Sequence, residues 1–354
     1  MSLNVKQDLG QGRKPLAIAD AKKITSIEIK HDEPSIIHLA DGSKSVSACI
    51  HCPDQPCVSY WDSENDDELT KQFRVDSTRY VCATNAIKWS YEHSQPQITI
   101  EDCVFCGVCA SRCPTRAIYL SVEGAKLVIQ PQSVFTQEKS GGHEHTRRTL
   151  HQTPTKGVFL NESDELVAKI LERFKSLGGR AAKLIPNLLT RNLFRTLNVP
   201  AEAYPQGVQY STVDVLSRKG NIYGAIEVEL TSAVIDVPRN LAGDVAVLVA
   251  RHGLSKSNLE TYSVVGRLPQ GREQYWMVVD DMESILGIKI LTASILLLYM
   301  LVWALKELNV RDNKLLLSEK HGISLRPYLE EVLGRQINLS VGFENQLEPS
   351  KLVE

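Results

Sequence analysis

The segment Cys103-Val-Phe-Cys106-Gly-Val-Cys109-Ala-Ser-Arg-Cys113-Pro114 decides the fold of the first third of the chain. Its four cysteines are separated by two, two and three residues, and a proline follows the last one. Three thiolates on so tight a loop can hold three irons of a 4Fe-4S cube, while the fourth thiolate, carried away by the proline, reaches a second cube. The spacing therefore predicts another set of four cysteines elsewhere in the chain.

The second set lies upstream and repeats part of the first. Cys49, Cys52 and Cys57 form one string, and Cys82-Ala-Thr-Asn-Ala-Ile87 echoes Cys113-Pro-Thr-Arg-Ala-Ile118. The eight cysteines of the 354-residue chain all belong to these strings. A repeat within the motif argues against coincidence.

Each fourth ligand of such paired strings serves the opposite cube, which fixes the expected ligand sets. Zinc prefers pairs of cysteines over a triple on one loop, and a disulfide framework is typical of short secreted chains, so both alternatives fit the pattern less well. We assign one cluster to Cys49, Cys52, Cys57 and Cys113, and the other to Cys103, Cys106, Cys109 and Cys82.

Composition bounds the rest of the chain. With 43% apolar residues, 23% charged residues and a net charge of -2, the chain can bury a core and shows no global signature of nucleic-acid binding. The first residues lack the apolar stretch of a signal peptide, so we expect a cytoplasmic protein. Length and composition predict domains at residues 1–130 and 162–354, joined by a polar linker at 131–161.

Apolar residues recur at helical spacing from Ser163 to Phe174 and from Ala181 to Leu197. Between Lys169 and Arg195 there are seven basic residues and a single acid, Glu172. Such a stripe could follow the phosphates of a nucleic acid. It could equally be the solvated face of two amphipathic helices, and the pattern leaves both interpretations open.

The stretch from 210 to 230 has the pattern of a β-hairpin that turns near Lys219-Gly220. We expect Ser217 to face Ile222 and Asp214 to face Ala225. Alternation then places three carboxylates on one face, where they repel one another unless a hard cation such as Mg²⁺ binds between them. The three are Asp214, Glu227 and Glu229.

Residues from about 45 to 120 resemble a bacterial-type dicluster ferredoxin domain. The string from Cys49 to Cys57 is similar to the first string of electron-transfer subunits in the molybdopterin oxidoreductase family. Two features depart from this pattern: 24 residues separate Cys57 from Cys82, where compact ferredoxins have only a few, and Ala83 replaces the usual proline. The insertion, Val58–Val81, is either a solvated loop or an excursion that docks a partner.

The hairpin resembles the motif of the PD-(D/E)xK nucleases, an acid on one strand and an acid-x-Lys pair on the next. The resemblance implies a restriction-endonuclease-like α/β domain with Asp214 and Glu227 as Mg²⁺ ligands and Glu229 in the place of the lysine, all three catalytic. The order of elements agrees, since a helix at 239–251 and strands at 261–268 and 275–280 are expected after the hairpin. The whole chain is therefore predicted to be an α+β multidomain protein.

One apolar run, Ile285–Leu305, is long enough to cross a bilayer at the lower limit. Lys289 interrupts it, and the 16 residues that follow are short for a membrane span and normal for a helix buried against a sheet. We expect the core helix and no contact with a membrane.

Two functions follow. In the first, two 4Fe-4S clusters are coupled to an Mg²⁺-dependent DNA endonuclease, as in a restriction or phage-defence component with redox gating, and the partners are a redox protein and double-stranded DNA. In the second, the chain is an electron-transfer subunit of a larger oxidoreductase, and its C-terminal domain only binds another subunit.

Overall fold

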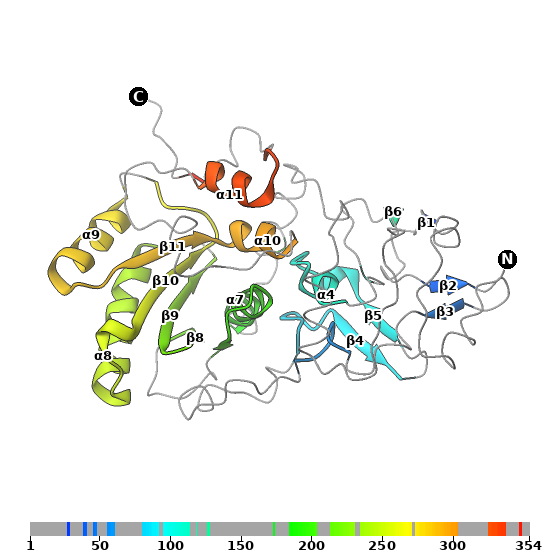
Figure 1. Ribbon diagram of the computed structural model, residues 1–354, viewed down its shortest axis with the longest axis horizontal. Coiled ribbons are helices and arrows are strands. Elements are labelled where there is room, and N and C mark those ends of the chain that lie inside the picture. The colour runs from blue at the N-terminus through cyan, green and yellow to red at the C-terminus, as the bar shows by residue number, and fades with distance from the viewer. Residues whose placement is uncertain are drawn as a thin grey trace. The chain divides into compact units, whose positions relative to one another are not determined.

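The computed structural model describes residues 27–28, 38–40, 45–47, 55–60, 80–91, 95–113, 118, 126–127, 173, 184–203, 213–230, 234–270, 273–303, 325–337 and 347–348. Cys49, Cys52, the predicted linker and most of the 58–81 insertion lie outside these residues, as does the helix predicted from Ser163 except for Arg173, which is helical. The predicted domain boundaries therefore stay a prediction. The chain divides into two compact units (Figure 1). The first comprises Met1–Ser63, Arg79–Asn161 and Trp303–Leu305, and the second Glu64–Thr78, Glu162–Val302 and Lys306–Glu354.

The described strands of the first unit are short and antiparallel. The residues that follow Cys82 enter β4, which pairs with β5 before the chain enters a 3-10 turn and the short helix α4. The elements are β1 (Ile27–Glu28) paired with β6 (Lys126–Leu127), β2 (His38–Ala40) paired with β3 (Ser45–Ser47), β4 (Ile87–Ser90), β5 (Gln95–Ile98) and α4 (Val108–Ser111).

Cysteine side chains make up much of the described core of the first unit. Cys57 and Cys113 are buried in it together with Ile87 and Ile118, and Cys82 and Cys109 pack against the cluster. Four of the six described cysteines therefore lie in or against one apolar cluster.

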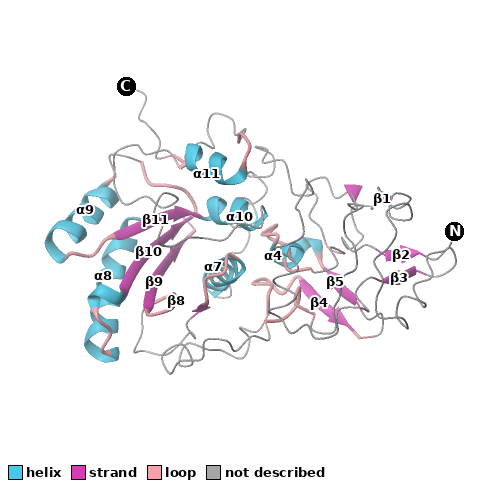
Figure 2. Cartoon of the chain, viewed as in Figure 1, coloured by secondary structure: helices cyan, strands magenta, loops and turns pink. Residues whose placement is uncertain are grey.

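The second unit is built on a five-stranded mixed sheet in the order β11-β10-β9-β8-β7 (Figure 2). The strands β7 to β9 form an antiparallel meander, whereas β9, β10 and β11 are parallel and are joined through helices. The elements are α7 (Leu184–Thr196), β7 (Ala201–Ala203), β8 (Val215–Lys219), β9 (Ile222–Glu229), α8 (Val237–His252), β10 (Leu259–Val265), α9 (Gln274–Leu286), β11 (Ile290–Ser294), α10 (Ile295–Trp303) and α11 (Arg326–Leu333).

Helices cover both faces of this sheet. Figure 1 shows α7 on one side and α8 and α9 on the other. Two contacts agree with this arrangement of the helices. The ring of Phe194 in α7 meets the ring of Tyr262 in β10 edge-on, whereas Tyr275 of α9 hydrogen-bonds to Thr292 of β11. Along the chain, α7 precedes β7, β8 and β9, and α8, β10, α9 and β11 follow them, so the helix and the first strand expected after the hairpin are present.

The predicted hairpin exists, but its register differs from the predicted one by two residues. Lys219 pairs with Ile222 and Ser217 with Gly224, so the turn consists of residues 220 and 221 alone. Gly220 has a φ of 64°, the positive value that two-residue hairpin turns favour. A shift of two residues keeps every side chain on its predicted face of the sheet, so the predicted alternation of side chains between the two faces is still correct.

The structure corrects two further predictions. The strand predicted at 275–280 belongs to helix α9, which buries Tyr275, Trp276, Val279 and Met282 along one helical face. The core helix predicted at 285–305 is instead the strand β11 followed by α10, because a run that is buried on every side has no period to distinguish the two. Within the described residues, none of the helices combines the length and the apolar character that crossing a membrane requires.

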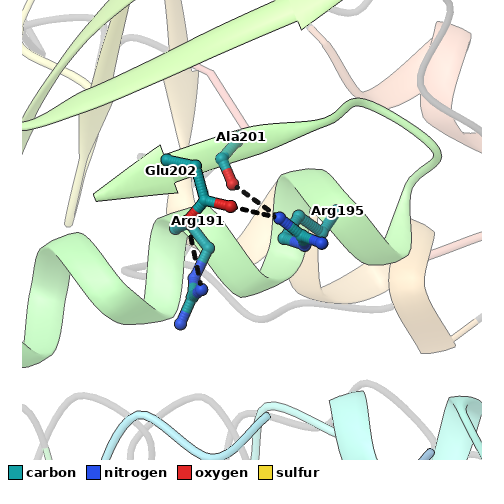
Figure 3. A network of polar contacts seen from close by, with 4 residues as sticks. All are labelled: Arg191, Arg195, Ala201 and Glu202. Carbon is teal, nitrogen blue, oxygen red and sulfur yellow. Dashed lines mark hydrogen bonds and ion pairs between the residues drawn. The ribbon is translucent and has the colours of Figure 1, made fainter. Parts of the chain in front are cut away.

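Two arginines of the predicted basic stripe form ion pairs within the protein (Figure 3). Arg191 and Arg195 of α7 form ion pairs with Glu202 of β7 at 3.6 Å and 2.7 Å, and Arg195 also donates to the carbonyl of Ala201 at 3.2 Å. The Arg191 side chain is only 1% exposed. These two arginines fasten α7 to the edge strand, so neither lies on a solvated face.

Candidate functional site

The loop from 103 to 109 turns sharply so that it can present three cysteines. Phe105 and Gly107 both have positive φ values, 58° and 74°, which reverse the backbone between successive thiols. The Phe105 amide donates to Cys103 Sγ at 3.4 Å, and the Ala86 amide donates to Cys82 Sγ at 3.1 Å. Amide donors of this kind stabilise thiolate ligands of iron–sulfur clusters.

Four thiols lie close enough to affect one another electrostatically. Burial raises the pKa of Cys106, and the charges of Cys82 and Cys103 raise it further. Burial also raises the pKa of Cys109, with added contributions from Cys106, Cys103 and Cys82. The structure thus brings together the four residues that the sequence assigns to one cluster. Bound iron would remove the cost of ionising them, because a coordinating thiol loses its proton to the metal.

A cluster and a single metal ion require different arrangements of their thiolate ligands. Among the described residues, no three cysteine, histidine or carboxylate side chains are arranged to hold one metal ion. A 4Fe-4S cube takes one thiolate at each iron, so its ligands stand farther apart than the ligands of one zinc ion. The six described cysteines are all free thiols, which excludes a disulfide between any two of them.

The second predicted set is described in part. Cys57 and Cys113 are buried in the same core cluster, and Cys49 and Cys52 lie outside the described residues. The long insertion leaves and rejoins the core at one place, because the Val81 amide donates to the Val58 carbonyl at 2.9 Å. The insertion can therefore separate Cys57 from Cys82 in sequence without separating the two ends of the loop in space.

Two side chains that sequence reasoning missed hold the ligand loops. The indole Nε1 of Trp303, a residue of the first unit, donates to the Cys106 carbonyl at 3.0 Å. The guanidinium Nε of Arg112 donates to the Pro56 carbonyl at 2.7 Å, next to Cys57. Neither contact has a sequence signal, since the partners are 197 and 56 residues apart.

In the second unit, Asp214 and Glu227 meet at the open end of the β8–β9 hairpin. The register places Asp214 opposite Glu227, one position beyond the pair of Val215 and Ile226. Asp214 accepts hydrogen bonds from the Asn187 side chain at 2.7 Å and the Val228 amide at 2.9 Å. The predicted pairing of Asp214 with Ala225 is therefore wrong, and the correct register brings the two acids closer together.

Glu227 carries the more unusual carboxyl group. Its Oε1 accepts from the Asn240 side chain at 2.8 Å, and Glu227 also shares a side-chain hydrogen bond with Asp214. Burial, followed by the charges of Asp214 and Asp244, raises the pKa of Glu227 to about 9. At neutral pH Glu227 therefore keeps a proton that an ordinary glutamate would lose.

Burial also raises the pKa of Asp214, and hydrogen bonds from Val228 and Asn187 oppose that rise. The charge of Glu229 raises it as well, so the third predicted acid acts on the pair. Sequence reasoning missed the fully buried Asp244, which shares one face of α8 with Asn240, four residues before it. The spacing of these two polar residues within an apolar helix is the signal that could have revealed them.

The residues present fit a magnesium ion of the usual kind. Asp214 and Glu227 supply two neighbouring carboxyl groups that a cation could bind in place of the proton they share. Mg²⁺ in proteins is commonly held by one or two carboxylates, with water and substrate phosphate oxygens completing its octahedron. The pair therefore has the number of carboxyl groups that a magnesium site commonly uses.

One family comparison identifies part of the chain. Residues 96–119 match the model of the 4Fe-4S binding domain. The match includes Cys103, Cys106, Cys109 and Cys113 and does not extend to the second unit. No curated protein and no solved structure matches the chain. The chain is therefore an iron–sulfur protein of the electron-transfer type that carries a 4Fe-4S binding region.

Proposed function

We propose that the first unit holds two 4Fe-4S clusters and passes single electrons to or from a redox partner protein. The gathering of Cys82, Cys103, Cys106 and Cys109 supports the ligand set of one cluster. The shared burial of Cys57 and Cys113 supports the other. Each cluster would supply one-electron chemistry when bound.

We further propose that the second unit is an Mg²⁺-dependent endonuclease that acts on double-stranded DNA. The observation that carries this proposal is the meeting of Asp214 and Glu227 on adjacent strands, each held by an asparagine, with a proton retained on Glu227. The β-β-β-α-β order, with α7 before it, also agrees with the resemblance to PD-(D/E)xK nucleases. A purely structural pair of acids gains nothing from such burial.

The chain's own residues would divide the work of phosphodiester hydrolysis. Asp214 and Glu227 would hold Mg²⁺, which when bound polarises the phosphate and acidifies a water molecule. Glu229, two residues further along β9, would accept the proton of the attacking water. The water oxygen then forms a bond to phosphorus, the bond to the leaving oxygen breaks, and that oxygen takes up a proton from solvent.

Redox gating of this hydrolysis would suit a cytoplasmic restriction or phage-defence component. Electrons arriving from the partner protein would change the charge of the clusters, and the activity of the second unit would depend on that charge. Under the other function, an electron-transfer subunit, the acids of the second unit would have no substrate and only the redox chemistry would remain.

The test uses full-length protein purified without oxygen. We expect about eight irons and eight sulfides per chain, the content of two 4Fe-4S clusters. With Mg²⁺ the protein should nick supercoiled plasmid, at different rates in the oxidised and dithionite-reduced forms. Asp214→Asn should abolish nicking, whereas the control Glu283→Gln, which removes an exposed acid of α9, should not. Full iron content without nicking under any condition would leave the electron-transfer subunit as the function.

A further inference from the structure

The turn that follows Cys82 folds back over the sulfur of that cysteine. The Asn85 amide donates to the Cys82 carbonyl at 3.2 Å, and Asn85 has a φ of 61°, a positive value that asparagine adopts more readily than most residues. The next amide, that of Ala86, donates to Cys82 Sγ at 3.1 Å. The hydroxyl of Thr84, within the same turn, lies 3.4 Å from the same sulfur atom. Two polar groups of one turn therefore converge on a single sulfur.

The direction of the contact between Thr84 and Cys82 depends on whether the sulfur carries a proton. A free thiol can donate to the hydroxyl or accept from it. A cysteine bound to iron is a thiolate, which has no proton to donate and can only accept. With a cluster bound, the hydroxyl of Thr84 is therefore the donor. The hydrogen bond then has a charged acceptor, and such bonds are stronger than those between neutral groups.

A donor at a ligand sulfur also affects the electron that a cluster takes up. Reduction adds one negative charge to the cluster and its thiolates, so a hydrogen bond to sulfur is stronger in the reduced state. Hydrogen bonds to the sulfurs are accordingly among the factors that set the potentials of iron–sulfur clusters. The Ala86 amide belongs to the backbone, whereas the Thr84 hydroxyl belongs to a side chain. A substitution can therefore remove the second donor and leave the first in place.

We propose that Thr84 raises the reduction potential of the cluster that Cys82 binds, because its hydroxyl donates a hydrogen bond to the Cys82 thiolate and holds it on the cluster. Thr84 is thus a positioning residue that acts through a ligand. This inference rests on the proposed function, and it needs only one cluster. The step that the hydrogen bond favours is the transfer of one electron from a one-electron reductant to this cluster, with no bond broken and no proton moved. The four ligands of the cluster all belong to the described residues: Cys82, Cys103, Cys106 and Cys109.

Three substitutions isolate the hydroxyl group. Thr84→Val keeps the branched shape of the side chain and removes the hydroxyl, whereas Thr84→Ser keeps the hydroxyl and removes the methyl group. Thr84→Ala is a second variant without the hydroxyl, and it makes the result independent of how well valine fits. Thr99→Val is the matched control, because it makes the same exchange at an exposed threonine of the same unit.

The experiment is an EPR-monitored redox titration of anoxically purified, full-length protein, with iron counted in every sample. In Thr84→Val and Thr84→Ala we expect one midpoint to become more negative by about tenfold in the reduction equilibrium, which is about 59 mV for one electron. Thr84→Ser and Thr99→Val should keep the wild-type midpoints.

Loss of about four irons from Thr84→Val and Thr84→Ala, with full iron content in Thr84→Ser, would also support the inference, because the hydroxyl would then be needed to hold the ligand on the cluster. Wild-type midpoints and full iron content in Thr84→Val and Thr84→Ala would overturn it. An equal shift in Thr84→Ser would overturn it as well, since the hydroxyl would then not be the cause. Wild-type protein that binds no iron would instead contradict the proposed clusters themselves, so the two failures are distinguishable.

Discussion

Replacing Glu227 by glutamine tests the carboxylate pair directly. Glutamine has the shape of the protonated glutamic acid and cannot ionise. Its amide can still accept from Asn240 through oxygen and donate to Asp214 through nitrogen, as the protonated acid does. The variant should therefore fold like the wild-type protein at low pH and differ from it as the pH rises.

The magnitude follows from the raised pKa of Glu227, about 9 against an ordinary value of 4.5. Below the ordinary value both the folded and unfolded chains carry the proton, and above about 9 neither does. Between them only the folded chain carries it, so the free energy of unfolding falls by about 1.4 kcal/mol per pH unit as the pH rises. From pH 6 to pH 8 the wild-type protein should lose about 2.5 kcal/mol relative to Glu227→Gln.

The assay is urea unfolding of the second unit at a series of pH values, followed by the fluorescence of the buried Trp276. The difference in the free energy of unfolding between the variant and the wild type removes the contribution of every other titrating group, because the two proteins share those groups. Glu283→Gln should keep the wild-type slope. Excess Mg²⁺ should flatten the wild-type slope, because the cation replaces the proton on Glu227. Parallel pH profiles for Glu227→Gln and the wild type without Mg²⁺ would refute the reasoning.

Three further changes test other parts of the molecule. Cys82→Ser should remove about four of eight irons by iron analysis; retention of all eight would contradict the crosswise ligand set. Trp303→Phe removes the indole donor to the ligand loop and should speed the loss of visible absorbance in the presence of a chelator, whereas an unchanged rate would count against this role. Glu202→Gln removes the carboxylate that pairs with the buried Arg191 and with Arg195, and should cost about 3 kcal/mol or more by urea unfolding, against less than about 1 kcal/mol for the exposed-pair control Arg239→Gln.

The sequence predicted the features that have a local period. The helices near 184–196 and 237–252, the strand at 259–265 and the hairpin are all present because each alternates apolar and polar residues with its own spacing. The predicted hairpin register was wrong because the length of the turn depends on the backbone conformation at Gly220. The predictions for residues 274–286 and 290–303 were wrong because aromatic and aliphatic residues give the same sequence pattern when they are buried on a helix and when they are buried on both faces of a strand.

The site residues also divide into those that a local sequence pattern predicts and those that only the fold reveals. Cysteine spacing is a local pattern, so the ligands of a cluster could be chosen from the sequence before their proximity was known. The supporting side chains could not, because Arg112, Trp303, Asn187 and Asn240 reach their partners through the fold alone.

The two units share one physical principle, although their chemistry differs. In each, burial and like charges raise the pKa values of the groups that would bind a metal: Cys106 and Cys109 in one unit, Glu227 in the other. A buried acid that keeps its proton is stable while neutral and becomes costly once ionised, unless a cation compensates for the charge. Binding iron or Mg²⁺ would therefore release protons, and because the metal and the proton compete for the same groups, binding should tighten as the pH rises.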